Sequence, residues 1–340
     1  MAMKNEQWVF ANRPTRGPDD TTFALQSCEY PSCPDNGVII QTMYFSVDPY
    51  MRGRLSQAKS YAEGWQLGKP GQGGMVGKIV ESHTSNYNVG DIVVGSGDWK
   101  RYLAVSKPQL IKVETSVAPY SYLGMIGMPG LSAYFPLEDI GKPKPSDTVY
   151  ISGAAGVVGL VAGQICANVK GCKRVIGSAG TDEKVEYLKS VGYHDAFNYN
   201  KIEPAEALPK LCPDGIDVYS DNVGGPTLDA AFANMNTFGR IIACGGISQY
   251  NKTPAETYGL KNFMATVRSQ LTIGGFIVGR WARQFPQGRQ ALAAYIADGK
   301  IKEQYTFYNG FESIPDAFQG LFKGKNLGKM VVSVGGESKM

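Results

Sequence analysis

A run of spaced glycines is the feature of this 340-residue chain that points most directly to chemistry. The string Gly153-Ala154-Ala155-Gly156-Val157-Val158-Gly159 follows the apolar segment 148–152 and precedes a segment, 160–170, with helical apolar spacing. Between a strand and a helix, glycines let the backbone approach a pyrophosphate, whose charge then lies on unpaired N–H groups. The spacing is G-x-x-G-x-x-G, so the flanking strand and helix support the prediction of a dinucleotide-binding turn. A strand-to-helix turn without a ligand is the alternative.

The end of the next expected strand, 174–176, indicates which dinucleotide binds. NAD-binding folds usually place Asp or Glu there, about 20 residues past the glycines. Here the strand ends Ile176-Gly177-Ser178-Ala179-Gly180, and Asp182 and Glu183 fit better in the first turn of the next helix, where they complement its dipole. Lys184 follows, and a cation there can pair with a 2′-phosphate. We therefore predict NADP(H) rather than NAD(H). A solvated helix lysine is the alternative for Lys184.

The composition argues against several functional classes. The 34 basic and 30 acidic side chains give a net charge of +4, which is small and scattered for a nucleic-acid partner. Residues 1–10 lack the apolar segment of a signal peptide, and no segment approaches the roughly 20 apolar residues of a membrane helix. Six cysteines in so long a chain do not form a disulfide framework. We expect a cytoplasmic protein with no membrane or nucleic-acid partner.

Potential metal ligands are few and dispersed. The two histidines, His83 and His194, are far apart, and Cys28 and Cys33 form a lone C-x4-C. A catalytic zinc needs three convergent ligands, and a structural zinc usually needs four with short spacings. We therefore predict no metal site, and we expect the cysteines to be buried or surface thiols. The other four are Cys166, Cys172, Cys212 and Cys244.

Two kinds of organisation follow one another along the chain. Residues 1–125 have short apolar segments punctuated by Gly, Asn and Asp, which favours a barrel-like all-β domain. From residue 126 strands and helices alternate, which is typical of a doubly wound parallel sheet. The tail, 303–340, is expected to return and complete the first domain, so that the α/β dinucleotide-binding domain is 126–302. The expected strands of this α/β domain are 149–151, 174–176, 196–198, 216–219, 240–244 and 271–276, and its expected helices are 158–170, 182–191, 204–211 and 227–235.

Six strings together resemble one family. They occur in order as Ser46-Val47-Asp48-Pro49-Tyr50-Met51-Arg52, Gly127-Met128-Pro129-Gly130-Leu131-Ser132-Ala133-Tyr134, the glycine turn, Asp221-Asn222-Val223-Gly224-Gly225, Cys244-Gly245-Gly246-Ile247-Ser248-Gln249-Tyr250-Asn251 and Asn326-Leu327-Gly328-Lys329. They are similar to the zinc-independent medium-chain dehydrogenase/reductases that reduce activated double bonds. Within these, the chain resembles the subfamily of leukotriene B4 12-hydroxydehydrogenase and of prostaglandin, alkenal and curcumin reductases.

The resemblance spans nearly the whole chain and implies a fold and a cofactor. The fold is a GroES-like β-barrel catalytic domain plus a Rossmann domain, with NADPH in a cleft between them. Gly156, Val157, Val158 and Gly159 would meet the pyrophosphate, and Lys184 and Tyr199 the 2′-phosphate end. The rest of the cofactor would lie along Asn222, Cys244, Gly245, Gly246, Ile247, Ser248, Phe276, Ile277, Val278 and Asn326. Some of these residues also have plain structural explanations, as a strand cap, a core thiol, an apolar edge strand or a turn.

The resemblance also implies a reaction. Hydride from NADPH would attack the β-carbon of an α,β-unsaturated ketone or aldehyde while charge develops on the carbonyl oxygen. A hydroxyl donor would stabilise the enolate. Tyr250 is the first candidate, Tyr50 the second, and the cofactor's ribose hydroxyl a third. An NADPH:quinone oxidoreductase and a non-catalytic NADPH-binding sensor are the alternative functions. The family is usually homodimeric, with residues 271–278 pairing across a two-fold axis.

Overall fold

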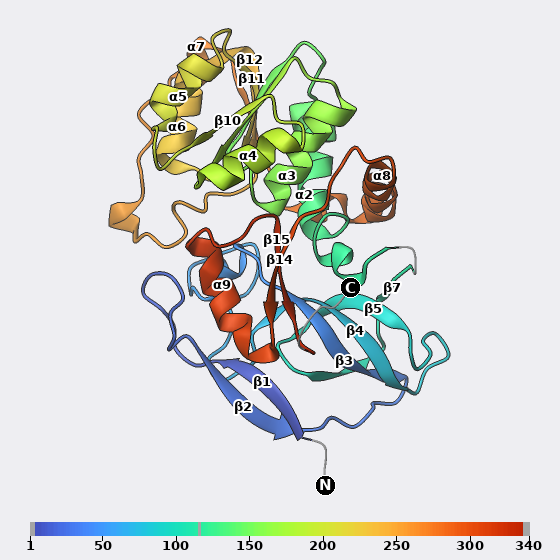
Figure 1. Cartoon of the computed structure of the whole chain (residues 1–340). Coiled ribbons are helices and arrows are strands. Elements are labelled where there is room, and N and C mark those ends of the chain that lie inside the picture. Colours follow the sequence, from blue (N-terminus) through green and yellow to red (C-terminus); the bar gives the residue numbers. More distant parts are fainter. Residues whose placement is uncertain (1–3, 115–116, 336–340) are drawn as a thin grey trace. The chain divides into compact units, whose positions relative to one another are not determined.

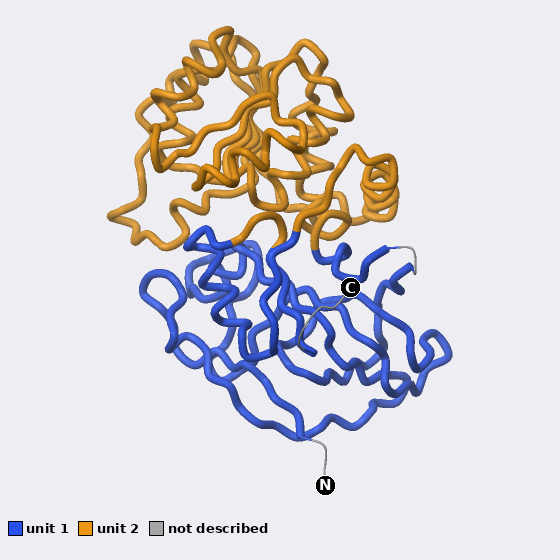
Figure 2. Tube along the Cα trace, in the orientation of Figure 1, with its two compact units in different colours: residues 1–123, 305–325, 330–340 blue, residues 124–304, 326–329 orange. Residues whose placement is uncertain are grey.

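The computed structural model describes residues 4–114 and 117–335, and the chain folds into two compact units (Figures 1 and 2). Unit 1 contains the residues up to Leu123, the segment 305–325 and the residues from Met330 onward. Unit 2 contains 124–304 and 326–329. Each unit is therefore built from segments that are far apart in the sequence.

Unit 1 is a β-barrel-like unit built on one large sheet. Its strands run in the order β14-β15-β3-β4-β5-β7, and β6 also pairs with β3. β1 and β2 form a separate antiparallel pair. The strand bounds are β1 Lys4–Phe10, β2 Phe23–Glu29, β3 Gly37–Ser46, β4 Gln72–Ser82, β5 Ile92–Asp98, β6 Tyr102–Ser106, β7 Ile111–Lys112, β14 Tyr305–Asn309 and β15 Lys329–Ser333, and the helices are α1 Met51–Arg54 and α9 Ile314–Phe322.

Aromatic side chains fill the core of unit 1. The Trp99 indole is fully buried, with its ring centre 4.9 Å from that of Phe23 and 5.3 Å from that of Trp65. Phe318 of α9 packs on the same indole at 6.3 Å. The segment 305–325 therefore supplies part of the core as well as strand β14.

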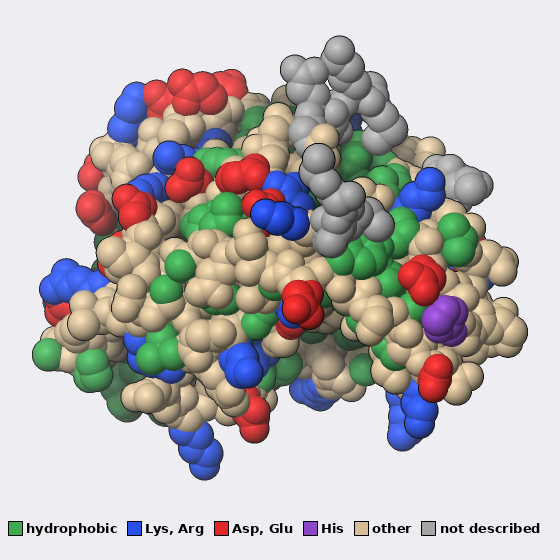
Figure 3. Space-filling model, turned by 90° about the horizontal axis from the view of Figure 1, so that it is seen from below, with side chains coloured by type: hydrophobic (Ala, Val, Ile, Leu, Met, Phe, Trp, Pro, Cys, Tyr) green, Lys and Arg blue, Asp and Glu red, His purple; other side chains and the backbone are tan. Residues whose placement is uncertain are grey.

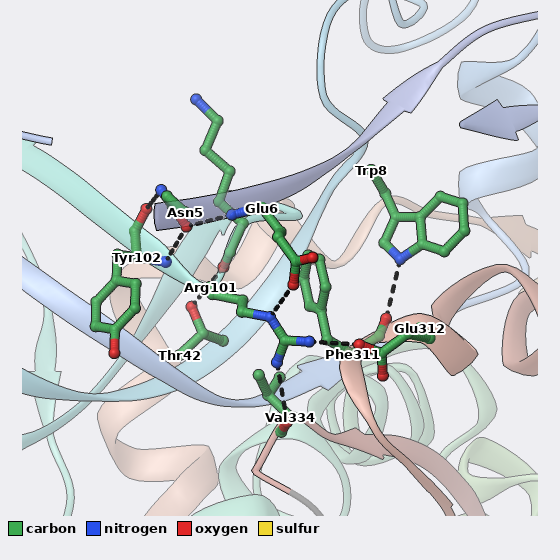
Figure 4. A network of polar contacts seen from close by, with 10 residues as sticks. Asn5, Glu6, Trp8, Thr42, Arg101, Tyr102, Phe311, Glu312 and Val334 are labelled. Carbon is green, nitrogen blue, oxygen red and sulfur yellow. Dashed lines mark hydrogen bonds and ion pairs between the residues drawn. The ribbon is translucent and has the colours of Figure 1, made fainter. Parts of the chain in front are cut away.

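Arg101 joins three segments of unit 1 (Figure 4). Its guanidinium pairs with Glu6 of β1 at 2.6 Å and with Glu312, and it lies 4.7 Å from the ring centre of Phe311. The Trp8 indole N–H donates to the Phe311 carbonyl at 2.9 Å. Because ionic, ring and backbone contacts meet at one side chain, β1 and the segment 311–312 are fixed on the same part of the barrel.

Unit 2 contains a six-stranded sheet in the order β10-β9-β8-β11-β12-β13, and all its pairings are parallel. The chain starts at the centre, moves outward through β9 and β10, and then returns to β11 on the other side of β8. This reversal between β8 and β11 is the switch point of a doubly wound sheet. The strands are β8 Thr148–Ile151, β9 Arg174–Ala179, β10 Asp195–Asn198, β11 Ile216–Asp221, β12 Met235–Ala243 and β13 Thr272–Gly275.

Helices connect these strands and pack in groups. α2 packs against α3 and α8, α5 packs against α6, and α4 lies on β9 and β10 (Figure 1). α3 continues as a π-helical turn over Ile165–Val169, so the expected helix 158–170 is helical up to Val169 but changes its winding. The helix bounds are α2 Met128–Pro136, α3 Val157–Gln164, α4 Asp182–Ser190, α5 Pro204–Leu211, α6 Gly225–Asn234, α7 Ala265–Arg268 and α8 Phe285–Ala297.

The surface carries charges of both signs. On the face drawn in Figure 3, basic and acidic side chains are interspersed, and the coloured residues form no continuous basic area. Within 4–114 and 117–335, no helix has the length and apolar character needed to cross a bilayer.

Candidate functional site

The parallel sheet of unit 2 brings the ends of six strands to one edge. Ile151 pairs with Gly177, and Asp221 pairs with Ala243, which in turn pairs with Gly275. The predicted glycine turn, Tyr199, Asn222, the segment 244–250 and Phe276 all follow carboxyl ends of these strands. Open α/β sheets bind ligands at this edge, next to the switch point. The sheet therefore gathers most of the predicted cofactor residues at one place.

The glycine turn has the geometry of a phosphate cradle. Gly153 has a φ of +58°, which L side chains rarely adopt. A Cβ on Gly159 would lie 2.6 Å from the Ala154 Cα, so only glycine allows the helix to lie this close to the turn. Gly156 is the N-cap of α3, and no side chain of the described segments caps that end by a hydrogen bond. The amides of Val157 and Val158 in the first turn are thus suited to an anionic ligand.

Asn326 is placed next to this turn by the return of the chain. The Gly328 amide donates to the Ala155 carbonyl at 2.8 Å, and Gly328 forms a parallel bridge with Gly156. The Asn326 amide group donates to the Gly328 carbonyl at 3.0 Å. The structure therefore brings Asn326 to the glycine turn although about 170 residues of sequence separate them.

The end of β9 lacks the carboxylate of an NAD-type site. Asp182 lies in the first turn of α4 as predicted, and its oxygens accept from Asn198 at 2.8 Å and pair with Lys201. The Tyr199 hydroxyl lies 2.7 Å from where a Cβ on Gly180 would be, so the tyrosine covers the end of the strand. Lys184 is half-buried in the same turn of α4, and burial lowers the pKa of its ammonium group. A phosphate at this position would compensate the desolvated cation.

A buried polar network, which the sequence did not indicate, fixes the switch point. One carboxylate oxygen of Asp221 accepts from the Tyr219 hydroxyl at 2.6 Å and from the Ser152 hydroxyl at 3.1 Å. The same oxygen accepts the amides of Val223 at 3.0 Å and Gly224 at 2.8 Å. Asn222 donates from its side chain to the Ser152 carbonyl at 2.8 Å. These contacts compensate the buried charge and hold Asn222 between β8 and β11.

The segment 244–250 folds back onto β11. The Cys244 and Gly245 amides donate to the Asp221 carbonyl at 2.9 and 3.0 Å, and the Ser248 hydroxyl donates to the Val223 carbonyl at 2.7 Å. Burial, with a smaller effect of Asp221, raises the pKa of the Cys244 thiol to about 12. The thiol is therefore neutral in the physiological range, and it is unsuited to act as a nucleophile.

Tyr250 lies at the end of this segment. Its hydroxyl accepts the Gly246 amide at 3.2 Å, and it would be 2.9 Å from a Cβ on Gly245. The absence of a side chain at Gly245 therefore allows the phenol to reach the backbone that follows β12. Accepting an N–H bond polarises a hydroxyl and makes it a stronger donor.

Asp229 of α6 anchors the chain that follows Tyr250, a role that no sequence pattern indicated. It is only 5% exposed, and its carboxylate accepts the Lys261 amide at 2.7 Å and the Asn262 amide at 2.8 Å. The Tyr258 hydroxyl donates to the second oxygen at 3.1 Å. One carboxylate thus fixes both the backbone and a side chain of the segment 258–262.

The second predicted donor, Tyr50, is not carried by the unit 2 sheet. Tyr50 belongs to unit 1, half-buried against its core, with the Arg54 guanidinium 5.9 Å from its ring centre. Burial raises the pKa of Tyr50, so its phenol stays protonated.

The last strand of unit 2 is shorter than the expected strand 271–276, because β13 covers only Thr272–Gly275. Phe276 and Ile277 follow it, and the Phe276 ring centre lies 5.4 Å from that of Trp281.

Comparisons with known proteins agree with this geometry. Residues 6–113 match a family described as the N-terminal domain of oxidoreductase, and residues 157–294 match the family described as zinc-binding dehydrogenase. The chain belongs to the medium-chain dehydrogenase/reductases. This confirms the family and the two-part α/β fold predicted from the sequence.

The relatives lie in the predicted subfamily. The chain is 37% identical to the NADPH-dependent curcumin reductase of Escherichia coli, over 98% of each chain. It is 40% identical to prostaglandin reductase 1 of Mus musculus, over 96% of this chain and 98% of the relative. The crystal structure of CurA in complex with NADPH from Vibrio vulnificus superposes with a TM-score of 0.92 at 37% identity, covering 98% of this chain and 100% of that one.

Proposed function

We propose that this protein is an NADPH-dependent oxidoreductase that reduces the carbon–carbon double bond of α,β-unsaturated ketones and aldehydes. The observation that supports this most is the edge of the unit 2 sheet, where a glycine turn, a half-buried Lys184 and the segment 244–250 lie together in a chain of the double-bond reductase subfamily. Curcumin-type enones, oxo-prostaglandins and alkenals are the substrate classes that its relatives suggest.

The residues at this edge fit NADPH. The first-turn amides of α3 would receive the pyrophosphate, and Lys184 and Tyr199 the 2′-phosphate end. Asn222, Asn326 and the segments 244–248 and 276–278 would line the remaining length. When bound, the cofactor supplies the hydride that the reaction consumes. The protein then has to orient the substrate and stabilise charge.

Tyr250 is our candidate for the stabilising donor. Its hydroxyl would donate a hydrogen bond to the substrate's carbonyl oxygen, where negative charge develops as the β-carbon is reduced. The Gly246 amide at 3.2 Å supports the phenol in this role, because it polarises the O–H bond without competing for the proton. Tyr50 is the second candidate, with a phenol that burial keeps protonated.

We propose that a hydrogen-bond donor and not zinc polarises the substrate. The one group of three or more His, Cys, Asp or Glu side chains with converging ligand atoms in the described chain is formed by Cys33, Glu81 and His83. These residues lie at the opposite end of β3 from Ser46, whose end of the strand leads to Tyr50. A ten-residue strand spans about 30 Å, so this group is remote from that end.

We further propose that the protein works in the cytoplasm as a homodimer. Among the described strands β13 pairs with β12 alone and forms one edge of the sheet, and Ile273 and Ile277 are 43% and 50% exposed. An exposed apolar edge strand is a surface that proteins commonly cover by pairing.

A substrate panel tests the proposed function. The absorbance of NADPH would be followed with an aliphatic alkenal, curcumin, an oxo-prostaglandin and a benzoquinone, and products would be identified by NMR. We expect turnover of enones to saturated carbonyl compounds with the carbonyl retained. Turnover of the quinone alone would instead identify a quinone reductase, and NADPH binding without oxidation in any reaction would identify a non-catalytic sensor.

A further inference from the structure

Three side chains with metal-binding atoms converge at one end of the barrel in unit 1. The Cys33 thiol, a Glu81 carboxylate oxygen and a His83 imidazole nitrogen all lie within 4.8 Å of one another. The His83 Nε2 is 3.2 Å from the Glu81 Oε1. We propose that these three residues form a binding site for a divalent transition-metal ion, with Zn²⁺ as the expected ligand.

The distances suit a tetrahedral zinc ion. Zinc bonds of about 2.0–2.3 Å in tetrahedral geometry place neighbouring ligand atoms about 3.3–3.7 Å apart. The imidazole nitrogen and carboxylate oxygen of the cluster are 3.2 Å apart, just below the lower end of this range. The Cys33 Sγ lies at most 4.8 Å from the other two ligand atoms. A shift of about 1 Å would bring it to bonding distance of the ion, and a small change of χ1 within the same rotamer supplies such a shift.

The backbone presents the three ligands to one another. The start of β3 pairs with the end of β4, with Ile39 opposite Glu81, and the His83 amide donates to the Gly37 carbonyl at 2.9 Å. Glu81 and His83 are two residues apart, so an extended backbone places them on the same face. Gly37 in turn donates to the carbonyl of Pro34 at 3.0 Å, which fixes the segment that contains Cys33.

The electrostatic surroundings favour a cation. The Glu81 carboxylate is one of the converging groups, and a second carboxylate, Asp35, is two residues from Cys33 in the sequence. Zn²⁺ would replace the thiol proton and offset the two negative charges of thiolate and carboxylate. Cys28, on β2, is a thiol outside this cluster and therefore serves as a control.

The donor set determines the class of metal. Thiolate and imidazole ligands select zinc and similar ions over magnesium and calcium, which prefer oxygen. Three protein ligands leave the fourth position for water. The ion would link the segment that precedes β3, which contains Cys33, to the end of β4. This structural role is separate from the proposed reduction. No metal site was predicted from the sequence, because 48 residues separate Cys33 from Glu81 and no local spacing signals their proximity.

Equilibrium dialysis of the chelator-treated, full-length protein against zinc chloride tests the site. We expect the wild-type protein and Cys28→Ser to retain about one equivalent of zinc that Cys33→Ser and His83→Gln lose. With Co²⁺ as the probe, the wild type and Cys28→Ser should show sulfur-to-cobalt charge-transfer absorption that Cys33→Ser lacks. Circular dichroism and NADPH titration would verify that each variant is folded.

Two results would overturn the proposal. The first is a folded wild-type protein that retains no zinc after dialysis. The second is equal retention by the wild type, Cys33→Ser and His83→Gln, which would place the ion elsewhere. Neither result affects the proposed reductase function, because enone turnover is measured separately and the cluster takes no part in it.

Discussion

Lys184 is the side chain on which cofactor choice depends most directly. It is half-buried on the first turn of α4, in a chain whose β9 ends without a carboxylate. A hydrogen bond between charged groups contributes about 1.5–3 kcal/mol, or roughly 10- to 100-fold in affinity. We therefore expect Lys184→Gln to raise the Kd for NADPH by about that factor and to leave the Kd for NADH nearly unchanged.

Fluorescence titration with both nucleotides measures this selectivity. Lys189→Gln is the matched control, because Lys189 lies on the same helix and pairs with Glu186 at 3.6 Å and Asp195 at 3.4 Å. The control should bind both nucleotides as the wild type does. If Lys184→Gln raised the Kd for NADPH and the Kd for NADH by the same factor, contact between Lys184 and the 2′-phosphate would be contradicted.

Tyr250 can be tested by removing only its hydroxyl. If the phenol stabilises the developing enolate, Tyr250→Phe should lower kcat on an enone by about 100-fold, as loss of one such donor typically does. The Kd for NADPH should change little, which separates catalysis from cofactor binding. Tyr61→Phe is a control at an exposed position of unit 1. Unchanged turnover by Tyr250→Phe would transfer the role to Tyr50 or to a ribose hydroxyl.

At the scale of elements, local patterns predicted the parallel sheet well. Five of the six strands of unit 2 were expected within three residues of their observed bounds, because buried parallel strands are continuous apolar runs. β12 begins five residues before its expected start, because its first part contains polar and exposed residues. β1 and β2 were not predicted, since Lys4–Phe10 begins with four polar residues and is held by pairing with residues 23–29. α2 was missed because Pro129, Gly130 and Pro136 oppose a helix in isolation.

The candidate site was also predictable only in part, because some of its contacts join distant segments of the chain. Glycine spacing and strand ends are local and were visible in the sequence. The bond from Gly328 to Ala155, the Asp221 network and the anchoring by Asp229 depend on residues brought together from distant segments. Such contacts follow from tertiary packing, which no single window of sequence encodes.

The Asp229 carboxylate should keep the segment that follows Tyr250 in one ordered conformation. Asp229→Asn keeps one oxygen, which can still accept the Lys261 and Asn262 backbone N–H groups, and turns the other into an NH2 group that faces the donors of the Tyr258 and Asn262 side chains. Leaving buried donors unsatisfied costs about 1–3 kcal/mol. We expect faster amide hydrogen exchange and faster proteolysis in 251–263, and a higher KM for enones. Asp214→Asn, at an exposed ion pair with Lys173, should change neither, and unaltered exchange in Asp229→Asn would contradict the anchoring role.

Buried thiols and phenols should make the free energy of unfolding of the chain fall as the pH becomes alkaline. Burial raises the pKa of the Cys212 and Cys244 thiols to about 12, against an ordinary value of 9.0. Burial likewise raises the pKa of Tyr150 and Tyr219. The unfolded chain therefore loses protons before the folded chain does, so the stability from the thiols is complete below pH 9.0 and falls between 9.0 and 12.

Urea unfolding at about pH 8 and about pH 10 measures this dependence. The two thiols together should lower the free energy of unfolding by about 3 kcal/mol at the higher pH. Cys212→Ala should reduce that difference by about half, because one of the two thiols is removed. A free energy of unfolding that rises with pH would contradict the assignment.

The pairing of β3 with β15 has a consequence for protein synthesis. Ser46 of β3 pairs with Val331, and the turn at Gly156 receives Gly328, so both early segments await partners that are translated much later. At 5–20 residues per second, the ribosome needs roughly 15–60 seconds between Ser46 and Val331 and roughly 9–35 seconds between Gly156 and Gly328. During that time the nascent chain exposes an open strand edge, a template for aggregation that chaperones must shield.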